Sequence, residues 1–448
     1  MIKRKITSRL IDFYKQTPKA LLLTGARQTG KSFSIRHFGT SFFNHFIEIN
    51  FIEQPMARNI FVHATDTQDM LMRLSAFTSE KLVKGDTLIF LDEIQECPEA
   101  LTAVKFLVDE GSYRYIMSGS LLGVEMKDLR SAPVGYIDVW EMFPLDLEEF
   151  FEAVGVSDRV MTHLRSSWET LRPVDEVVHM KLMAIFRLYL IVGGMPSVVQ
   201  KYLDSNNLQY VLEEQRAILR LYQIDITKYD PDNKLYIREI FGLIPPELNA
   251  KNKRFILKNL NQHLKFSRYE NSFIWLKDAG VALPTFSVEE PKAPLVLSRS
   301  RNLFKLFQND VGLLAASYAD GIQTRILDDD PNINYGSIYE NLVAQELRCH
   351  GFDLYYFNNK KQGEVDFVVE KSGCALPIEV KSGKTYQRHH ALSNILSDES
   401  YGIREAWVLS GANVSVVGNI KYLPIYLLMF LKKEEAQPTV YKIDLPDL

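Results

Sequence analysis

The stretch "KALLLTGARQTGKSFSIRHFG", Lys19–Gly39, decides the fold of the first part of this chain of 448 residues. Its apolar run predicts a buried strand, and "KSFSIRHFG" predicts a helix that ends at Gly39. The glycine-framed loop between them fits the pattern Gly-x4-Gly-Lys-Ser, in which backbone N–H groups surround phosphate oxygens. Because strand, loop and helix follow in the order that this pattern requires, the stretch predicts a P-loop.

Each residue type in this loop suits nucleotide binding. Glycines let the backbone N–H groups turn toward phosphate oxygens, and the following helix points its positive end at them. Lys31 adds a cation, and the Ser32 hydroxyl is a ligand for Mg2+. The predicted contacts with ATP are Gly25, Ala26, Arg27, Gln28, Thr29, Gly30, Lys31, Ser32 and Phe33.

Two further apolar strands are predicted to end near the same loop. "DTLIFLDEIQECPEAL" predicts a strand over residues 88–91, after which Asp92 is placed to hold Mg2+ and Glu93 to polarise water. "YRYIMSGSLLG" predicts a strand after which Ser118 or Ser120 senses the terminal phosphate, although such residues are also typical of plain turns. The predicted catalytic residues are Glu93, Asp92 and Lys31, the metal ligands are Ser32 and Asp92, and Ser120 joins the nucleotide contacts.

Five segments together resemble a prokaryotic AAA-type ATPase family whose C-terminal part is a domain of unknown function. They are "LLLTGARQTGKS", "TLIFLDEIQECPEAL", "SGSLLG", "MFPLDLEEF" and "YLIVGGMPSVVQKYL". The similarity runs over nearly the whole chain. It implies an AAA module with a small helical lid that ends near the "GGMP" turn, followed by DNA-related or signalling modules.

The segment from Ser157 to Lys228 has a helical pattern throughout, and we expect it to form the lid. An AAA site often takes an arginine from a neighbouring subunit, and Arg130, Arg216 and Arg220 are candidates that the sequence does not separate. The expected division is an AAA-type core over 1–155, a lid over 156–230, a winged helix over 231–300 and a nuclease-like domain over 301–448.

The expected winged helix lies in Lys234–Leu283, which reads as three short helices divided at "IPPELN" and "LKFSRY". The Pro-rich "SVEEPKAPLVL" follows as wing and exit strand. A basic group without acidic neighbours lies inside, and its candidate DNA contacts are Lys251, Lys253, Arg254 and Lys258. Such residues bind phosphates, but winged helices also dock proteins, and both possibilities stay open.

The last third of the chain holds a second group of acidic and basic residues with a regular spacing. "GEVDFVVEKSGCALPIEVKSG" predicts a hairpin with Ser372-Gly373 at its turn. Asp366 lies in the first arm, Glu379 and Lys381 share a face of the second, and Glu340 or Glu346 lies on the preceding helix.

This arrangement resembles the PD-(D/E)xK restriction-endonuclease-like superfamily. The resemblance implies that two carboxylates bind Mg2+ and that the lysine helps to form the hydroxide that attacks a phosphodiester. The proline usual before the aspartate is replaced here by Val365. An ordinary half-exposed strand, a fold that has kept binding without catalysis, and another phosphate chemistry all remain open.

Composition limits the function classes. A formal net charge of -4 argues against a chain that coats nucleic acid along its length, so any such site is local. Cys97, Cys349 and Cys374 have no disulfide or metal spacing, which suits a reducing compartment. The start lacks the apolar core of a signal peptide, and "YLPIYLLMFL" is too short to cross a membrane, so we expect a cytoplasmic protein.

The sequence thus predicts an α/β chain with a P-loop AAA-type parallel sheet, a helical lid, a winged helix and a restriction-endonuclease-like α/β domain. The predicted function is Mg2+-dependent ATP hydrolysis coupled to a C-terminal DNA-binding or nuclease-like module. The alternative is a nucleotide-operated switch or scaffold whose C-terminal domain binds a protein partner without catalysis. ATP and Mg2+ are the expected cofactors, and DNA, a protein and a second copy of the chain are possible partners.

Overall fold

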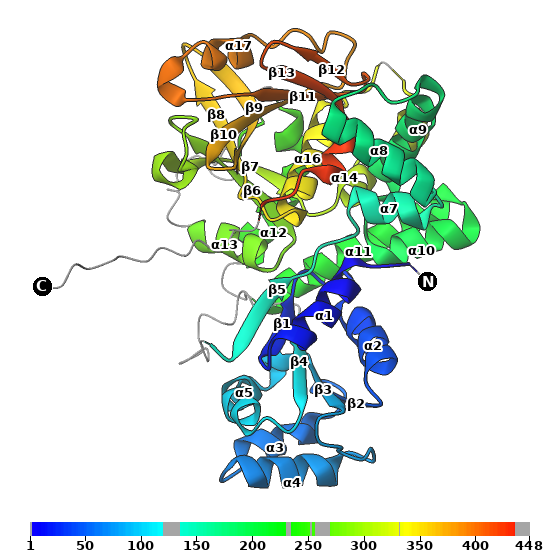
Figure 1. Ribbon diagram of the computed structural model, residues 1–448, viewed down its shortest axis with the longest axis vertical. Coiled ribbons are helices and arrows are strands. Elements are labelled where there is room, and N and C mark those ends of the chain that lie inside the picture. Colours follow the sequence, from blue (N-terminus) through cyan, green and yellow to red (C-terminus); the bar gives the residue numbers. More distant parts are fainter. Residues whose placement is uncertain are drawn as a thin grey trace, which may run out of the picture.

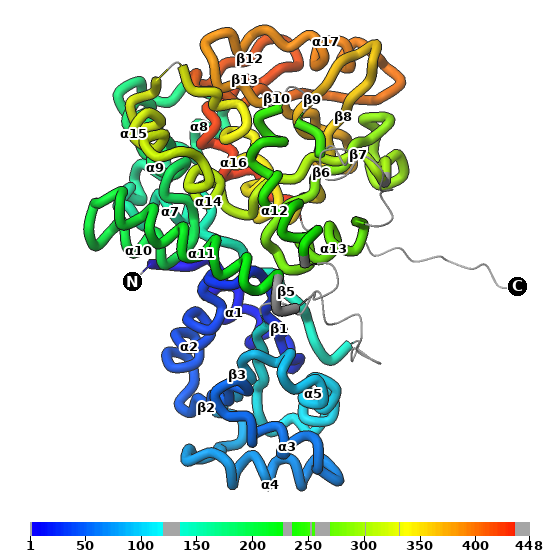
Figure 2. Tube along the Cα trace, turned by 180° about the vertical axis from the view of Figure 1, so that it is seen from behind, coloured from blue at the N-terminus to red at the C-terminus, as the bar shows by residue number. Residues whose placement is uncertain are grey.

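The computed structural model describes residues 2–119, 135–229, 234–250, 253–255, 269–330 and 332–434. The molecule is elongated, with an α/β core formed by the N-terminal part at one end and a second sheet at the other (Figure 1). Helices that follow the core in sequence lie between and beside the two sheets, as the view from behind also shows (Figure 2).

The N-terminal core is built on a parallel five-stranded sheet of order β2-β3-β4-β1-β5. Strands β1 and β3 are apolar along their length and are covered on both faces, as the continuous apolar runs predicted. The strands are β1 (Ala20–Thr24), β2 (His45–Asn50), β3 (Thr87–Asp92), β4 (Arg114–Ser118) and β5 (Ile137–Glu141).

Helices cover both faces of this sheet. Helices α1 (Lys5–Gln16) and α2 (Lys31–Phe42) pack on one face. The other face is covered by α3 (Asn59–Val62), α4 (Thr67–Phe77) and α5 (Pro98–Glu110). The core is therefore a three-layer α/β unit, as predicted for a P-loop fold.

Helix α2 runs past Gly39, where the sequence predicted its end. Gly39 is buried, and a Cβ atom built there would overlap the ring of Phe46 on β2. The glycine is therefore explained by the close packing of α2 on the sheet, and the predicted helix stop was wrong.

The segment predicted as a lid is helical, but it shares one hydrophobic core with the C-terminal part. The Trp168 ring packs edge-on against Trp407, with ring centres 5.1 Å apart. Phe186 packs in the same way against Tyr339, with ring centres 5.3 Å apart. The helices between the two sheets in sequence are α7 (Leu147–Ala153), α8 (Asp158–Thr170), α9 (Glu176–Val192), α10 (Pro196–Ser205), α11 (Leu208–Tyr229), α12 (Lys234–Asn249) and α13 (Glu270–Asp278), of which α8 to α11 lie within the predicted lid.

Helix α12 contains "IPPELN", where the sequence predicted a break. Prolines remove helical hydrogen bonds, yet α12 continues through Pro245 and Pro246 because its apolar face is buried on both sides of them. The buried residues of that face include Ile240, Ile244 and Leu248. Packing thus outweighs the local signal.

The C-terminal part is built on a mixed eight-stranded sheet of order β12-β13-β11-β10-β9-β8-β6-β7. Its strands are β6 (Ala282–Val288), β7 (Arg299–Gln308), β8 (Tyr355–Asn359), β9 (Gly363–Lys371), β10 (Cys374–Val380), β11 (Ala406–Ser410), β12 (Ser415–Val417) and β13 (Ile420–Pro424). The remaining helices are α14 (Val311–Ala316), α15 (Ile322–Leu327), α16 (Gly336–Cys349) and α17 (His390–Leu396), with short 3-10 turns at η1 (Pro55–Arg58), η2 (Ile94–Glu96), η6 (Leu295–Ser298), η7 (Glu399–Tyr401) and η8 (Ile425–Phe430).

Two features of this sheet bear on the predictions. Strands β9 and β10 form the predicted antiparallel hairpin, with Ser372 and Gly373 in the left-handed region at its turn. Strands β6 and β7, which flank the predicted wing, instead extend the same sheet, because β6 pairs in parallel with β8. Buried side chains such as Phe304 and Phe307 hold β7 in this sheet, and the winged helix stays a prediction.

Candidate nucleotide-binding site

The P-loop after β1 has the backbone that its glycines allow. Gly25 has a φ of 128° and Gly30 a φ of 91°, and Gln28 between them is also left-handed at 68°. A Cβ atom at Gly25 would overlap the backbone of Met142. The two glycines are therefore required by conformation at both ends of the loop, and by close packing at the first.

Lys31 begins α2 and folds back into the loop. Its Nζ donates to the backbone oxygens of Gly25 at 2.9 Å and Ala26 at 2.8 Å. Burial lowers the pKa of Lys31 to about 8, while the charges of Glu93 and Asp92 oppose that shift. The ammonium group is thus held inside the loop beside two carboxylates.

Asp92, at the end of β3, joins residues from neighbouring elements. Its oxygens accept hydrogen bonds from Ser32 Oγ at 3.1 and 3.0 Å and from Asn50 Nδ2 at 3.3 Å. Ser118 Oγ, at the end of β4, also donates to Asp92. Mg2+ prefers oxygen ligands, and the buried Asp92 carboxylate lies beside the Ser32 hydroxyl. The residues present therefore fit this ion.

Glu93 follows directly and is held in an unusual conformation. Its φ is 55°, a left-handed value that costs a residue with a side chain roughly 1–3 kcal/mol and is typical of functional sites. Gln95 Nε2 donates to Glu93 Oε2 at 2.5 Å, which fixes the orientation of the carboxylate.

The structure brings the predicted residues Lys31, Ser32, Asp92 and Glu93 together at the carboxyl edge of the parallel sheet. Ser120 lies outside the described residues, as do Arg130, Lys251 and Lys258. Asn50 was missed, although its place at the end of a strand of the same sheet was a usable signal. Of the remaining arginine candidates, Arg216 is paired with Asp320 and Arg220 is exposed.

Residues far along the chain hold the P-loop from outside. Tyr222 on α11 donates its hydroxyl to the Arg27 backbone oxygen at 3.1 Å, and Asp225 pairs with the Arg27 guanidinium at 2.8 Å. Gly280, between α13 and β6, lies so close that an added Cβ would be 3.0 Å from the Ala26 nitrogen. The loop is therefore in direct contact with the helices and with the turn that leads into the second sheet.

Two cavities lie next to this loop. One of about 320 Å³ lies between α1 and the start of α2 and is lined in part by Ile2, Ile11, Phe33 and His37. The exposed ring of Phe33 directly follows the phosphate-binding residues, so this groove is a candidate place for the base of a nucleotide.

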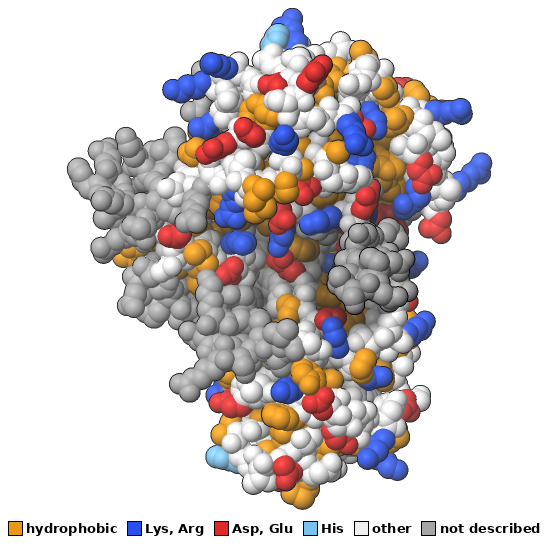
Figure 3. Space-filling model, turned by 60° about the vertical axis from the view of Figure 1, so that its left-hand side comes forward, with side chains coloured by type: hydrophobic (Ala, Val, Ile, Leu, Met, Phe, Trp, Pro, Cys, Tyr) orange, Lys and Arg blue, Asp and Glu red, His pale blue; other side chains and the backbone are white. Residues whose placement is uncertain are grey.

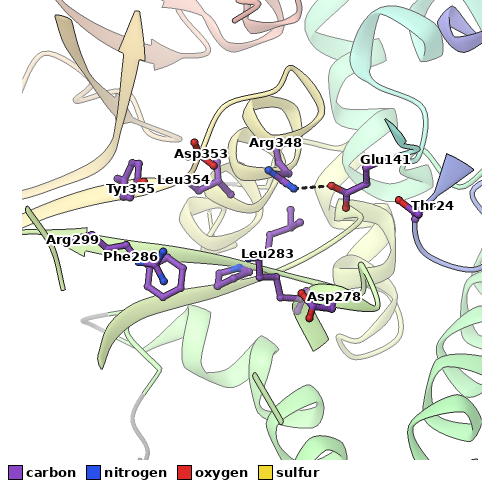
Figure 4. A pocket seen from close by; sticks show the side chains of 14 residues that line it. Thr24, Glu141, Asp278, Leu283, Phe286, Arg299, Arg348, Asp353, Leu354 and Tyr355 are labelled. Atoms are coloured by element: carbon purple, nitrogen blue, oxygen red, sulfur yellow. Dashed lines mark hydrogen bonds and ion pairs between the residues drawn. The ribbon is translucent and has the colours of Figure 1, made fainter. Parts of the chain in front are cut away.

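The other cavity, of about 310 Å³, separates the start of the loop from the C-terminal part (Figure 4). Arg348 points across it to Glu141, and their charged atoms are 2.7 Å apart. The Arg299 guanidinium lies 3.6 Å from the centre of the Phe286 ring. The ion pair of Arg348 with Glu141 thus joins the two halves of the molecule.

The predicted nuclease-like residues also lie near one another. Lys381 Nζ is 2.6 Å from Glu379 Oε1, and Asp366 Oδ2 accepts the Val380 N–H at 2.9 Å. Burial, with the neighbouring charges of Glu340 and Glu379, raises the pKa of Asp366 well above its usual range. Glu340 therefore belongs to this cluster.

Glu346, the alternative to Glu340, lies elsewhere and accepts the N–H of Leu147 at 2.9 Å. Among the residues that the structure describes, no group of three or more Asp, Glu, His or Cys side chains is arranged to hold a metal ion. The predicted carboxylates therefore converge without forming a recognisable metal site.

The candidate DNA contacts are partly committed to other partners. Lys253 pairs with the buried carboxylate of Glu340, and Arg254 is half-buried. On the face shown in Figure 3, basic and acidic side chains are intermixed. Within the described residues, Lys253 is thus already paired, and DNA contact by this group stays a prediction.

Comparison with family models supports the N-terminal assignment. Residues 17–151 match the model of an AAA domain. Residues 183–324 and residues 335–428 match two models that are each described as a domain of unknown function. The N-terminal part is thus an AAA-type α/β unit, and the endonuclease-like resemblance of the C-terminal part stays a prediction.

Solved structures show distant similarity. A Walker-type ATPase of Pyrococcus abyssi is 15% identical, with 71% of this chain and 96% of that chain covered at a TM-score of 0.42. The ORC1 protein of Aeropyrum pernix in complex with DNA is 14% identical, with 73% of this chain and 91% of that chain covered at a TM-score of 0.27. The RuvB Holliday junction branch migration motor of Thermotoga maritima is 15% identical, with 63% of this chain and 89% of that chain covered at a TM-score of 0.28.

A comparison with curated proteins finds no significant match. Across the described ranges, no helix is both long and apolar enough to cross a membrane.

Proposed function

We propose that this chain binds MgATP at the P-loop and hydrolyses it. The observation that carries the proposal is the convergence of Ser32, Asp92 and Ser118 at the end of the loop. These side chains come from α2, β3 and β4, so the sheet fixes their relative positions. The match of residues 17–151 to an AAA domain supports the same assignment.

The roles follow from the positions of the side chains. Lys31 exchanges its backbone partners for phosphate oxygens, and the N–H groups of the loop and of the α2 terminus donate to them. Ser32 and Asp92 hold Mg2+, which neutralises charge on the phosphates when it is bound. Glu93, fixed by Gln95, orients and polarises the attacking water, and Phe33 lies against the base.

The C-terminal part is proposed as the module that responds to the nucleotide. Tyr222, Asp225 and Gly280 contact the loop itself, so a change in its conformation reaches α11 and β6 directly. We propose that this module binds a partner, which is DNA or another protein. If adding duplex DNA changes ATP turnover, the partner is DNA. If turnover is unchanged and the mass of the assembly depends on the nucleotide, the partner is a protein or a second copy of the chain.

Nucleotide titration tests the assignment of the site. We expect Lys31→Ala to abolish ATP binding, because it removes the only cation that the pattern places on the phosphates. Asp92→Asn is expected to remove the Mg2+ dependence of binding while weak Mg2+-independent binding remains. Binding of MgATP by Lys31→Ala at wild-type affinity would contradict the proposed site.

A further inference from the structure

A fully buried lysine lies at the centre of the C-terminal carboxylate cluster. Lys305 on β7 is 0% exposed. Its Nζ lies 2.9 Å from Glu364 Oε1, 3.5 Å from Glu340 Oε2 and 4.0 Å from Asp366 Oδ1. Carboxylates from α16 and β9 therefore converge on one ammonium group. Lys305 was not among the predicted residues, because only the assembled sheet places it beside Glu340.

The other carboxylate oxygens are also largely occupied. Lys253 pairs with Glu340 Oε1, Lys381 pairs with Glu379 Oε1, and the Val380 N–H donates to Asp366 Oδ2. Within the described part of the chain, the buried Glu379 Oε2 has no hydrogen-bond partner. Apart from Glu379 Oε2, only Asp366 Oδ1 of the Glu340, Asp366 and Glu379 oxygens accepts no hydrogen bond in the described part of the chain, and it lies 4.0 Å from Lys305 Nζ.

The lysine keeps its charge in this setting. Burial alone lowers the pKa of a lysine, but the charges of Glu340, Asp366 and Glu364 raise that of Lys305 above its usual value. The Tyr356 ring lies 5.1 Å from Nζ and adds a favourable contact with the cation. A positive charge is therefore fixed among the carboxylates that would otherwise attract a divalent cation.

We propose that Lys305 takes the place of a divalent cation in this cluster, so that the C-terminal module does not bind Mg2+ there or cleave phosphodiesters. The cluster then has a binding and structural role, in which Lys305 and Lys253 hold α16 against the sheet. Because a fixed ammonium repels a cation and occupies the carboxylate oxygens, the nuclease-like residues are present without the metal site that their chemistry needs. The inference concerns a different site from the P-loop and does not depend on ATP hydrolysis.

Binding of Mn2+ to the nucleotide-free full chain tests this inference, with free Mn2+ measured by electron paramagnetic resonance. All proteins carry Asp92→Asn, so that the P-loop does not contribute. We expect Asp366→Asn to leave Mn2+ binding unchanged. Lys305→Met is expected to gain at least about tenfold in Mn2+ affinity, and adding Asp366→Asn should remove that gain. Lys305→Arg is the matched control, which keeps the charge and should gain nothing.

Several outcomes overturn the inference. If Asp366→Asn reduces Mn2+ binding in a protein that keeps Lys305, the cluster already holds a metal. A folded Lys305→Met protein that gains no Mn2+ affinity would show that Lys305 does not occupy the place of a cation. If Lys305→Met fails to fold by circular dichroism, the Asp366→Asn comparison decides alone. Mg2+-dependent DNA cleavage that is lost in Asp366→Asn would also refute the proposal.

Discussion

The buried ammonium of Lys31 makes the proposed ATP affinity depend on pH. Its pKa is lowered to about 8 from the usual 10.5, because burial disfavours the charge. Phosphate binding needs the charged form, so we expect constant affinity below about pH 8 and a loss of up to about tenfold per pH unit above it. Lys31→Arg stays charged and should bind with a flat profile, even if more weakly.

The pH dependence of stability shows whether a loss of ATP affinity at high pH reflects weaker binding or unfolding of the chain. Between pH 8 and 10.5 the folded chain binds fewer protons at Lys31 than the unfolded chain does. The contribution of this group to the free energy of unfolding therefore rises with pH in that range. A loss of affinity there is not a consequence of Lys31 destabilising the fold. Wild-type affinity that stays constant up to pH 9.5 would contradict the role of Lys31.

At the scale of elements, contiguous segments were predictable and long-range contacts were not. The order strand, loop and helix around Lys31 and the hairpin turn at Ser372 follow from local pattern. The continuation of α12 through Pro245 and the pairing of β6 with β8 depend on packing between segments far apart in sequence. Asp92 was predictable for its place after a strand, whereas Lys305 was not, because only the assembled sheet places it beside Glu340.

The contact between Gly280 and the P-loop gives an element-scale prediction. Gly280→Ala and Gly373→Ala introduce a side chain at nearly the same φ, 71° and 72°, so each should lose roughly 1–2 kcal/mol of stability. Gly280 also lies against Ala26, whereas a Cβ at Gly373 meets nothing within 4 Å. We expect Gly280→Ala to bind ATP about tenfold more weakly and Gly373→Ala to bind normally. Thermal melts measure the loss of stability, and nucleotide titrations measure ATP affinity. Equal ATP affinities of the two variants would show that the contact between Gly280 and Ala26 does not support nucleotide binding.

At the scale of the whole molecule, the helices and the C-terminal sheet share one core, and α11 contacts the P-loop. Nucleotide binding should therefore protect distant backbone amides. We expect hydrogen exchange with a non-hydrolysable ATP analogue to slow in α11 and near Gly280, while β12 at the sheet edge is unchanged. The Lys31→Ala protein should show no such protection. Slowed exchange confined to β1, the loop and α2 would show that the nucleotide does not act on the C-terminal part.

We propose that the P-loop site hydrolyses ATP, with Glu93 as the residue that polarises water. The most direct test measures MgATP binding and steady-state turnover on the same preparations of wild-type and Glu93→Gln protein. We expect Glu93→Gln to bind MgATP with similar affinity but to turn it over about 100-fold or more slowly, so that bound ATP accumulates. Hydrolysis by Glu93→Gln at the wild-type rate would contradict the role assigned to this residue.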